Sequence, residues 1–400
     1  MSSRAVSLRS VSKRRRWVVL GNPENRRITL FQAALCELRQ PAAHVVAYRD
    51  LLRGEIDLRE TLAQIAAERG ILRIESPGED HEVERRLIAR GAATGGIEPA
   101  AALRLRADLG RVRHVRQWFA GYSTVLNDIE RVIQGCRHLT VQNHPRAVRL
   151  LFDKPRCHAF LAARGVAAPP ALPPVTGYDD LREAMRAAGW PRVFVKLAWG
   201  SSASGVVAFS TSGTRPSAIT SLEMVRRRGK AHFYNNLRLA RYYRERDLRA
   251  IFDFLGREGI HVEKWLPKAV LGGRNFDLRV VTFAGKAGHV VVRTSRTPLT
   301  NLHLGNRRGD LSLLQQKAGS RWSIVPELCE QAARAFPDAL YVGWDVLVTP
   351  GFRKAYILEG NAFGDLLPGA SHAGLSTYGR GIAATLSADG RRVVEADGPI

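Results

Sequence analysis

A chain of 400 residues, 45% of them hydrophobic, is long enough for two or three domains, and it contains no apolar run long enough to span a membrane. The formal net charge of +24 suggests nucleic-acid binding, but only nine of the 61 basic residues are lysines and the arginines are spread over the whole length. We find no RNP pattern, paired Cys/His finger or basic helix-turn-helix, so a dedicated nucleic-acid role is the less favoured interpretation.

The N-terminal residues and the cysteines indicate the cellular compartment of the protein. Residues 1–16 are rich in arginine, and no apolar segment follows them, which predicts a disordered basic tail and not a secretory signal. The four cysteines, Cys36, Cys136, Cys157 and Cys329, are scattered and form no CxxC pair. This spacing argues against a zinc site or a disulfide scaffold and predicts a cytoplasmic protein.

The first part of the chain alternates strands and helices. Short buried strands are predicted at Trp17–Leu20, His44–Tyr48 and Ile71–Ile74, with a helix at Arg27–Leu38. This order predicts a parallel α/β layer, and the absence of a GxGxxG motif argues against a dinucleotide site. A helix is expected over Asn143–Gly165, and a domain boundary is placed near residue 145.

A lysine-bearing strand and a loop of small residues follow. Val193, Val195 and Leu197 alternate with Phe194 and Lys196, so Lys196 lies within a strand. The loop after it runs from Gly200 through Ser201, Ser202, Ala203 and Ser204 to Gly205. Small side chains let backbone N–H groups approach phosphate oxygens, so we interpret this segment as a phosphate-binding hairpin. The alternative is a flexible hairpin tip.

The next segments alternate between charged and apolar character. Residues 221–259 are charged and are expected to be helical. A long strand is predicted at Phe276–Phe283, and Val290–Arg293 is expected to pair with it. Arg279, Arg293 and Asn301 would then form a cationic corner suited to developing phosphoryl charge. The alternative is that both arginines only balance nearby carboxylates.

The corner is expected to face a C-terminal hairpin. Alternating residues over Val342–Val348 predict a half-buried strand, a second strand is predicted at Ile357–Asn361, and residues 349–351 supply a turn between them. Folding the hairpin about Phe352, just after this turn, brings Asp345 opposite Glu359, with Asn361 on the same face as Glu359. Two carboxylates and an amide suit Mg²⁺. The alternative is that the acids pair with surface arginines.

Taken in order, these motifs resemble the ATP-grasp superfamily over about residues 145–370. The resemblance rests on Lys154 before a proline-rich turn, the Lys196 strand with its small loop, the EKWL segment, the DLR strand and the final D…ExN hairpin. The DLR strand, Arg293 and the NLHLGN loop are most similar to the ribosomal-protein glutamate ligase and glutathione synthetase branch. EKWL is similar to the adenine hinge of D-alanine–D-alanine ligases.

The resemblance implies an α/β (α+β ATP-grasp) fold, in which two ATP-grasp subdomains follow an N-terminal parallel α/β domain and clasp the nucleotide. The expected segments are a basic tail (1–16), the N-terminal domain (17–145), the small subdomain with the phosphate loop (146–266) and the large subdomain with the Mg²⁺ and substrate site (267–390).

The resemblance also assigns residue roles. Lys154, Lys196 and the loop of Gly200, Ser201, Ser202, Ser204 and Gly205 would bind the ATP phosphates. Glu263 and the backbone of Lys264, Trp265 and Leu266 would bind adenine, and Asp277 or Asn275 would reach the ribose. Asp345, Glu359 and Asn361 would bind Mg²⁺, or Mn²⁺ in its place. Arg279, Arg293 and Asn301 would stabilise the reacting groups.

The chemistry implied by the family is ATP-dependent ligation of a carboxylate to an amine or thiol through an acyl phosphate, with release of ADP and phosphate. The expected substrate is a small molecule or a peptide that carries the carboxylate, and no motif identifies it. The oligomeric state is left open, with a dimer as one option. Two alternatives remain: an ATP-grasp phosphotransferase without an acyl phosphate, and a basic nucleic-acid-binding protein derived from this fold. One departure from the family pattern is Asp365, which follows the ExN motif and precedes Pro368.

Overall fold

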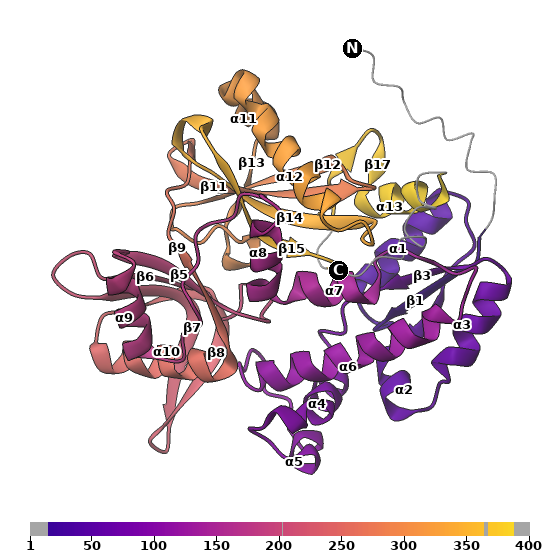
Figure 1. Cartoon of the computed structure of the whole chain (residues 1–400), viewed down its shortest axis with the longest axis horizontal. Coiled ribbons are helices and arrows are strands. Elements are labelled where there is room, and N and C mark those ends of the chain that lie inside the picture. The colour runs from indigo at the N-terminus through magenta and orange to yellow at the C-terminus, as the bar shows by residue number, and fades with distance from the viewer. Residues whose placement is uncertain (1–14, 202, 364–366, 388–400) are drawn as a thin grey trace.

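The computed structural model describes residues 15–201, 203–363 and 367–387. Three sheets of four or more strands, with their covering helices, form most of the described chain. The N-terminal sheet is on the right of the view, the small sheet on the left and the large sheet above (Figure 1). The expected basic tail, apart from its last two residues, lies outside the described residues, as do Ser202, Asp365 and residues 388–390. Among the described helices, none combines the length and apolar character needed to cross a bilayer.

The N-terminal sheet is parallel, with strand order β2-β1-β3-β4, which confirms the predicted parallel α/β layer. Its strands are β1 (Trp17–Gly21), β2 (His44–Ala47), β3 (Ile71–Ile74) and β4 (Thr140–Val141). Its helices are α1 (Arg26–Glu37), α2 (Tyr48–Arg53), α3 (Leu58–Ala67), α4 (His81–Arg90), α5 (Pro99–Leu103) and α6 (Val115–Gln134). Helix α1 begins where Asn25 accepts a hydrogen bond from the backbone N–H of Arg27, as expected of an N-cap asparagine.

The small sheet is antiparallel, with strand order β8-β7-β6-β5-β9. Its strands are β5 (Arg192–Leu197), β6 (Val207–Ser210), β7 (Ser217–Arg227), β8 (Lys230–Tyr242) and β9 (Ile260–Lys264), and its helices are α9 (Tyr178–Ala187) and α10 (Glu245–Glu258). Pairing of β5 with β6 confirms that the small-residue loop closes a hairpin.

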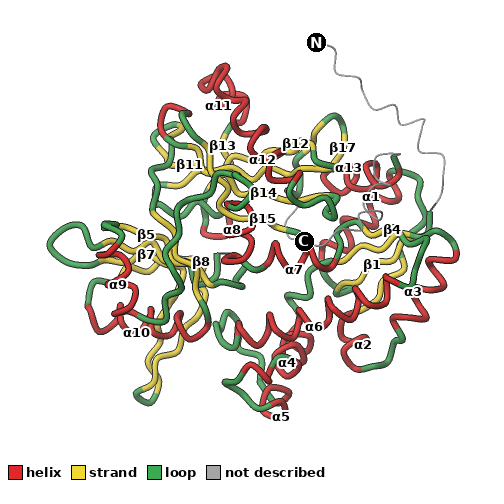
Figure 2. Tube along the Cα trace, in the orientation of Figure 1, coloured by secondary structure: helices red, strands yellow, loops and turns green. Residues whose placement is uncertain are grey.

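The expected helix over residues 221–259 is wrong for its first half. Only Glu245–Glu258 is helical, and the preceding residues form the long hairpin β7–β8, drawn as yellow strands in Figure 2. Arg228 and Gly229 join these strands, and both have positive φ, as a two-residue hairpin turn requires. Charged side chains are frequent on edge strands because they discourage pairing with other chains, and here they hid the strand pattern.

The large sheet has strand order β13-β12-β11-β14-β15, with β10 also paired to β11. Its strands are β10 (Val270–Leu271), β11 (Arg274–Phe283), β12 (Lys286–Ser295), β13 (Arg307–Gly309), β14 (Tyr341–Val348) and β15 (Ala355–Asn361). The associated helices are α7 (Pro145–Phe152), α8 (Lys154–Ala162), α11 (Leu311–Ala318), α12 (Ile324–Arg334) and α13 (Thr377–Leu386), the last preceded by the short pair β16 (Ser371–His372) and β17 (Leu375–Ser376). Single 3-10 turns occur at Ala92–Thr94, Leu302–Leu304, Gly319–Ser323 and Pro350–Phe352.

The predicted C-terminal hairpin forms with the expected register, since Asp345 lies opposite Glu359. The expectation that its first strand is half-buried is wrong, because all eight residues of β14 are buried. Strand β14 lies between β11 and β15. Helix α12 packs against it, and Phe336, two residues after the helix, contacts the ring of Trp344. A central strand covered on both faces loses the alternation of apolar and polar side chains.

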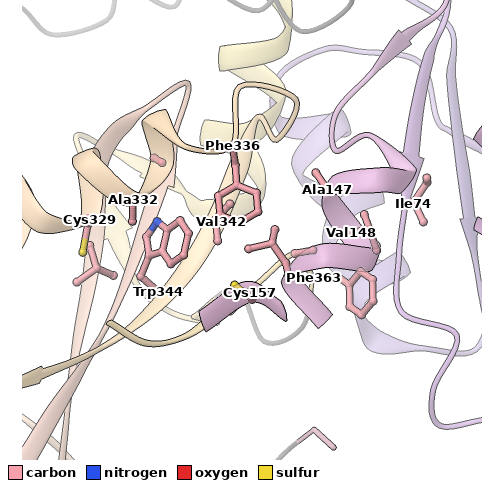
Figure 3. Packing of buried hydrophobic residues seen from close by; sticks show 14 of the residues in the cluster. Ile74, Ala147, Val148, Cys157, Cys329, Ala332, Phe336, Val342, Trp344 and Phe363 are labelled. Atoms are coloured by element: carbon pink, nitrogen blue, oxygen red, sulfur yellow. The ribbon is translucent and has the colours of Figure 1, made fainter. Parts of the chain in front are cut away.

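One hydrophobic core joins the N-terminal sheet to the large sheet, whereas the small sheet has a core of its own. Figure 3 shows the joint core, which extends from Trp344 and its neighbours past Phe363 and Val148 to Ile74. The buried Arg73 strengthens this connection. It donates to Glu75 and Gln142 and lies over the ring of Tyr341. The small sheet therefore folds against a larger unit composed of the other two.

Candidate active site

A cavity of about 270 Å³ opens where the three sheets meet. Most of the predicted site residues line it, namely Lys154, Lys196, Gly200, Ser201, Ser204, Arg279, Arg293, Asn301, Asp345, Glu359 and Asn361. The described lining does not include Gly205, Glu263, Lys264, Trp265, Leu266 or Asp277. Tertiary folding thus brings together residues from positions 154 to 361 of the chain.

Lys154 lies at a break between two helices. The single helix expected over Asn143–Gly165 is wrong, because α7 ends at Phe152 and α8 begins at Lys154. Asp153 causes the break as the N-cap of α8, accepting from the backbone N–H of Arg156 at 3.1 Å. Pro155, in the first turn of α8, has no N–H to continue an uninterrupted helix. The break directs Lys154 towards the small-residue loop, where its ammonium group donates to the carbonyl oxygen of Gly200.

The small-residue loop is compact and is tied to the sheet below it. Ala203 has φ of 59° and Gly205 has φ of 68°. A Cβ atom at Gly205 would lie 2.6 Å from Leu197 Cδ1, so the turn requires glycine there. The Ser221 hydroxyl donates to the Ala203 carbonyl at 2.7 Å. These contacts hold the loop backbone above the cavity. That the loop binds the ATP phosphates stays a prediction.

Lys196 and Glu263 form a buried ion pair between adjacent strands β5 and β9. The distance from Lys196 Nζ to Glu263 Oε2 is 2.7 Å, and His261 Nε2 lies 3.3 Å from the other carboxylate oxygen. Burial alone would raise the pKa of Glu263, but the Lys196 ammonium and His261 lower it to about 2. Lys196 also donates to the Leu358 carbonyl at 3.2 Å. The pair therefore joins the small sheet to β15.

The segment predicted to bind adenine already uses part of its backbone. The N–H of Lys264 donates to Pro170 O at 2.8 Å and that of Trp265 to Arg192 O at 3.3 Å. The Glu263 carboxylate is paired with Lys196, so adenine binding by Glu263–Leu266 would depend on the remaining backbone groups of the segment. It stays a prediction.

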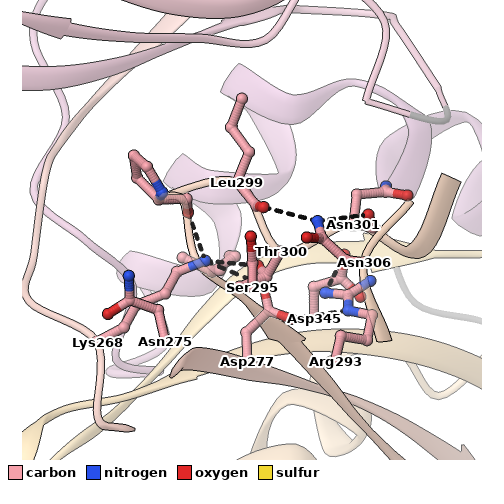
Figure 4. Close-up of polar contacts among 12 residues, drawn as sticks. Lys268, Asn275, Asp277, Arg293, Ser295, Leu299, Thr300, Asn301, Asn306 and Asp345 are labelled. Carbon is pink, nitrogen blue, oxygen red and sulfur yellow. Dashed lines mark hydrogen bonds and ion pairs between the residues drawn. The ribbon is translucent and has the colours of Figure 1, made fainter. Parts of the chain in front are cut away.

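A continuous ladder of charges crosses β12, β11 and β14. Arg293 Nε donates to Asp277 Oδ1 at 2.7 Å, and Arg293 Nη2 lies 3.1 Å from Asp345 Oδ2 (Figure 4). Arg279 Nε donates to Asp345 Oδ1. Burial would raise the pKa of Asp345, but Arg279 and Arg293 lower it to about 2. Each guanidinium has five N–H donors, so both arginines can keep Asp345 and still present donors to the cavity.

Asp277 faces away from the cavity, into a polar cluster. Besides Arg293, its carboxylate accepts from Lys268 Nζ at 3.2 Å and from the Thr300 hydroxyl. Burial, only partly opposed by Asp277, lowers the pKa of Lys268. The cluster is visible in Figure 4. Asp277 thus acts as an anchor for Arg293, and its predicted contact with ribose would require it to leave three donors.

Glu359 and Asn361 are the ligand groups least committed within the protein. Glu359 Oε1 lies 3.6 Å from Lys154 Nζ, and a quarter of its side chain is exposed. Asn361 donates its amide nitrogen to Gly343 O at 3.0 Å, so its amide oxygen is the atom it can offer a cation. Among the described residues no group of three or more His, Cys, Asp or Glu side chains is placed to hold a metal alone. A donor set of one or two carboxylates and an amide fits Mg²⁺ that also binds phosphate oxygens.

Comparison with known proteins agrees with this geometry at the level of the fold. No family model matches the chain, and no curated protein matches its sequence. Among solved structures, D-cycloserine synthetase DcsG matches with a TM-score of 0.54 and 14% identity over 93% of this chain and 100% of that one. The ATP-grasp ligase PsnB, complexed with minimal precursor, Mg and ADP, matches with a TM-score of 0.51 and 16% identity over 93% and 98%. D-alanine–D-alanine ligase from Bacillus anthracis, complexed with ATP, gives 0.51 and 10% over 96% and 100%.

The chain therefore has the fold of the ATP-grasp ligases, which confirms the resemblance stated from the sequence. The narrower similarity to the glutamate ligase and glutathione synthetase branch stays a prediction.

Sequence reasoning missed one whole wall of the cavity. Arg26, Arg27, Ser76, Gly78 and Glu79 line it from the N-terminal domain. A signal was available, since these residues follow directly after β1 and β3, and ligands of open α/β sheets bind beyond the carboxyl ends of the strands.

Proposed function

We propose that this protein is an ATP- and Mg²⁺-dependent ligase that joins a carboxylate to an amine or thiol through an acyl phosphate. The observation that supports this most is the convergence of Lys154, Lys196, Arg279, Arg293 and Glu359 on one cavity, beneath the small-residue loop. Four cations with one loosely paired carboxylate suit a polyphosphate and a divalent cation.

The proposed reaction divides the work among these residues. Lys154, Lys196 and the loop N–H groups bind the phosphates of ATP, and Glu359 and Asn361 hold Mg²⁺, which neutralises charge on the transferring phosphoryl group when bound. A substrate carboxylate oxygen attacks the γ-phosphorus, and the bond to the β-phosphate oxygen breaks, giving ADP and an acyl phosphate. Arg279 and Arg293 stabilise the charge that develops. An amine or thiol of the second substrate then displaces phosphate.

The state of the cysteines supports a cytoplasmic location, which is part of the same proposal. All four cysteines are free thiols, and two of them, Cys157 and Cys329, are buried. Burial raises the pKa of the Cys157 thiol to about 12, so this group remains protonated and unreactive. Four free thiols agree with a reducing compartment, and we place the ligase in the cytoplasm.

The test begins with nucleotide binding. Thermal unfolding of the full chain is measured with and without MgATP, for the wild type and Lys196→Ala. A ligand at a hundred times its Kd stabilises a folded protein by about 2.7 kcal/mol. A shift that requires Mg²⁺ and is lost in the variant supports the nucleotide site. No shift at millimolar nucleotide would refute the ligase proposal and favour a nucleic-acid-binding role.

The chemical step is tested by trapping. Candidate carboxylates are incubated with MgATP and hydroxylamine, which converts an acyl phosphate to a hydroxamate. Glu359→Gln should lower ADP and hydroxamate formation by about 100-fold or more, because a charged metal ligand is lost. Glu37→Gln, an exposed residue at the end of α1, is the matched control. ADP formation without any hydroxamate would favour a phosphotransferase, and full activity of Glu359→Gln would refute the metal assignment.

A further inference from the structure

The wall of the cavity contributed by the N-terminal domain lies at a special place in the parallel sheet. Strands β1 and β3 are neighbours, but the chain passes from β1 to β2 on the other side, so the strand order reverses between β1 and β3. In open α/β sheets such a reversal opens a crevice at the carboxyl ends of the strands, where ligands bind. The first turn of α1, which follows β1, supplies Arg26 and Arg27 to the cavity, and the loop after β3 supplies Ser76 and Glu79.

Arg27 has hydrogen-bonding capacity that the protein does not use. Its Nη2 lies 3.3 Å from Glu79 Oε1, whereas its Nε and Nη1 are buried without a partner. Only 15% of the Arg27 side chain is exposed, against 66% for Glu79. A pair with so exposed a carboxylate contributes little, while unpaired buried N–H donors of a charged group are costly. An oxygen-rich anion in the cavity would remove this cost.

The charge around Arg27 points to the same kind of ligand. Arg26 and Arg27 occupy the first turn of α1, and that turn contains no acidic residue. Cations are unfavourable there, because the backbone N–H groups of the turn already carry partial positive charge. Glu79, which lines the same wall, also accepts from the Asn25 side-chain amide at 2.7 Å. The wall therefore has an excess of positive charge and donors.

We propose that Arg26 and Arg27, with Ser76 from the neighbouring loop, bind a second anionic group of the substrate whose carboxylate is phosphorylated. The inference rests on the proposed ligase function and specifies its substrate class. The substrate carries a carboxylate that reacts near Arg279 and Arg293 and a distal carboxylate or phosphate that Arg27 receives with two donors. These residues are a binding determinant at a distance from the reacting atoms.

The experiment uses matched pairs of probes that differ only in one anionic group. The full chain is saturated with MgADP, and thermal unfolding is followed during titration with glutamate or glutamine, aspartate or asparagine, and phosphoserine or serine. In at least one pair the more acidic member should reach half-saturation at about a ten-fold lower concentration, as expected for hydrogen bonds to a charged group. The pair that responds distinguishes a carboxylate from a phosphate.

Variants assign the effect to the wall. Arg27→Met should abolish the preference for the acidic member and leave the MgADP shift unchanged. Arg26→Met should weaken the preference, and because Arg26 is exposed, this variant keeps the test valid should Arg27→Met fold poorly. Arg59→Met removes an exposed guanidinium from α3, outside the lining of this cavity, and should behave as the wild type.

The outcomes separate the two proposals. A normal MgADP shift with no preference in any pair would overturn the anionic subsite and leave the ligase proposal standing. A preference that survives in both Arg26→Met and Arg27→Met would also overturn it. Loss of the MgADP shift in Arg27→Met would show that this arginine binds the nucleotide instead. If MgADP and MgATP do not stabilise the wild type at all, the ligase proposal fails, and the subsite fails with it.

Discussion

The two charged walls of the cavity are built on different principles. In and behind the wall of the large sheet, Asp345 and Asp277 each accept from at least two cationic or hydroxyl donors, and Arg293, which pairs with both, is almost completely buried. In the wall formed by the start of α8 and the end of β15, below the small-residue loop, Lys154 contacts one backbone carbonyl and a carboxylate at 3.6 Å. The closed wall fixes the positions of Arg279 and Arg293, whereas the open wall keeps Lys154 and Glu359 able to exchange partners for a ligand.

Breaking the closed wall should have the largest effect. Asp345→Asn leaves Arg279 and Arg293 with a neutral partner in a buried setting, and we expect a loss of about 3–5 kcal/mol in the free energy of unfolding. Urea denaturation followed by circular dichroism measures this. Asp179→Asn, at an exposed ion pair with Arg249, is the control and should leave the midpoint nearly unchanged. An equally small change for Asp345→Asn would contradict the view that Asp345 organises the wall.

The Lys196–Glu263 pair, at the join between the walls, should control stability at acid pH. The folded-state pKa of Glu263 is about 2, below the 4.5 expected for an unfolded chain. Its stabilising contribution, roughly 3 kcal/mol, is therefore complete above pH 4.5 and is lost as the pH falls towards 2.

A pH series of urea denaturation on Glu263→Gln provides the check. The variant should be less stable than the wild type at pH 7, and the two stability curves should converge as the pH approaches 2. Glu37→Gln, exposed on α1, should run parallel to the wild type throughout. Curves for Glu263→Gln and the wild type that stay parallel would show that Glu263 does not titrate with a lowered pKa.

Removing a contact in the open wall should change the free energy of unfolding least. Lys154→Met removes the contacts with Gly200 O and Glu359, and we expect a loss of no more than about 1 kcal/mol in the free energy of unfolding. The local effect should be larger, because the small-residue loop loses a tether. Hydrogen exchange at the backbone amides of residues 200–205 should become faster in the variant, while exchange in β5 stays the same. Unchanged exchange in the loop would mean that Ser221 alone holds it.

The hairpin and the N-terminal layer were predictable because their signals are local. Apolar periodicity located β1, β3 and β14, and folding the last hairpin about Phe352 predicted that Asp345 would face Glu359. The hairpin β7–β8 was missed because β8 is an edge strand and β7 pairs with β6 only over residues 217–220, so charged side chains replace the alternation that identifies a strand. Likewise the helix break at Asp153 depends on one capping side chain within an otherwise helical pattern.

The sequence by itself determined the identity and order of the groups that could bind a nucleotide, since residue type and spacing along a strand or turn are local properties. The tertiary structure alone decided which groups are free to do so. Register between β11, β12 and β14 commits Asp277 and Asp345 to arginines, and the pairing of β5 with β9 commits Glu263 to Lys196. The packing of the N-terminal sheet against the large sheet brought Arg26 and Arg27 to the same cavity. Such partnerships join residues far apart in the chain, and their energies depend on distance and burial, which no local pattern encodes.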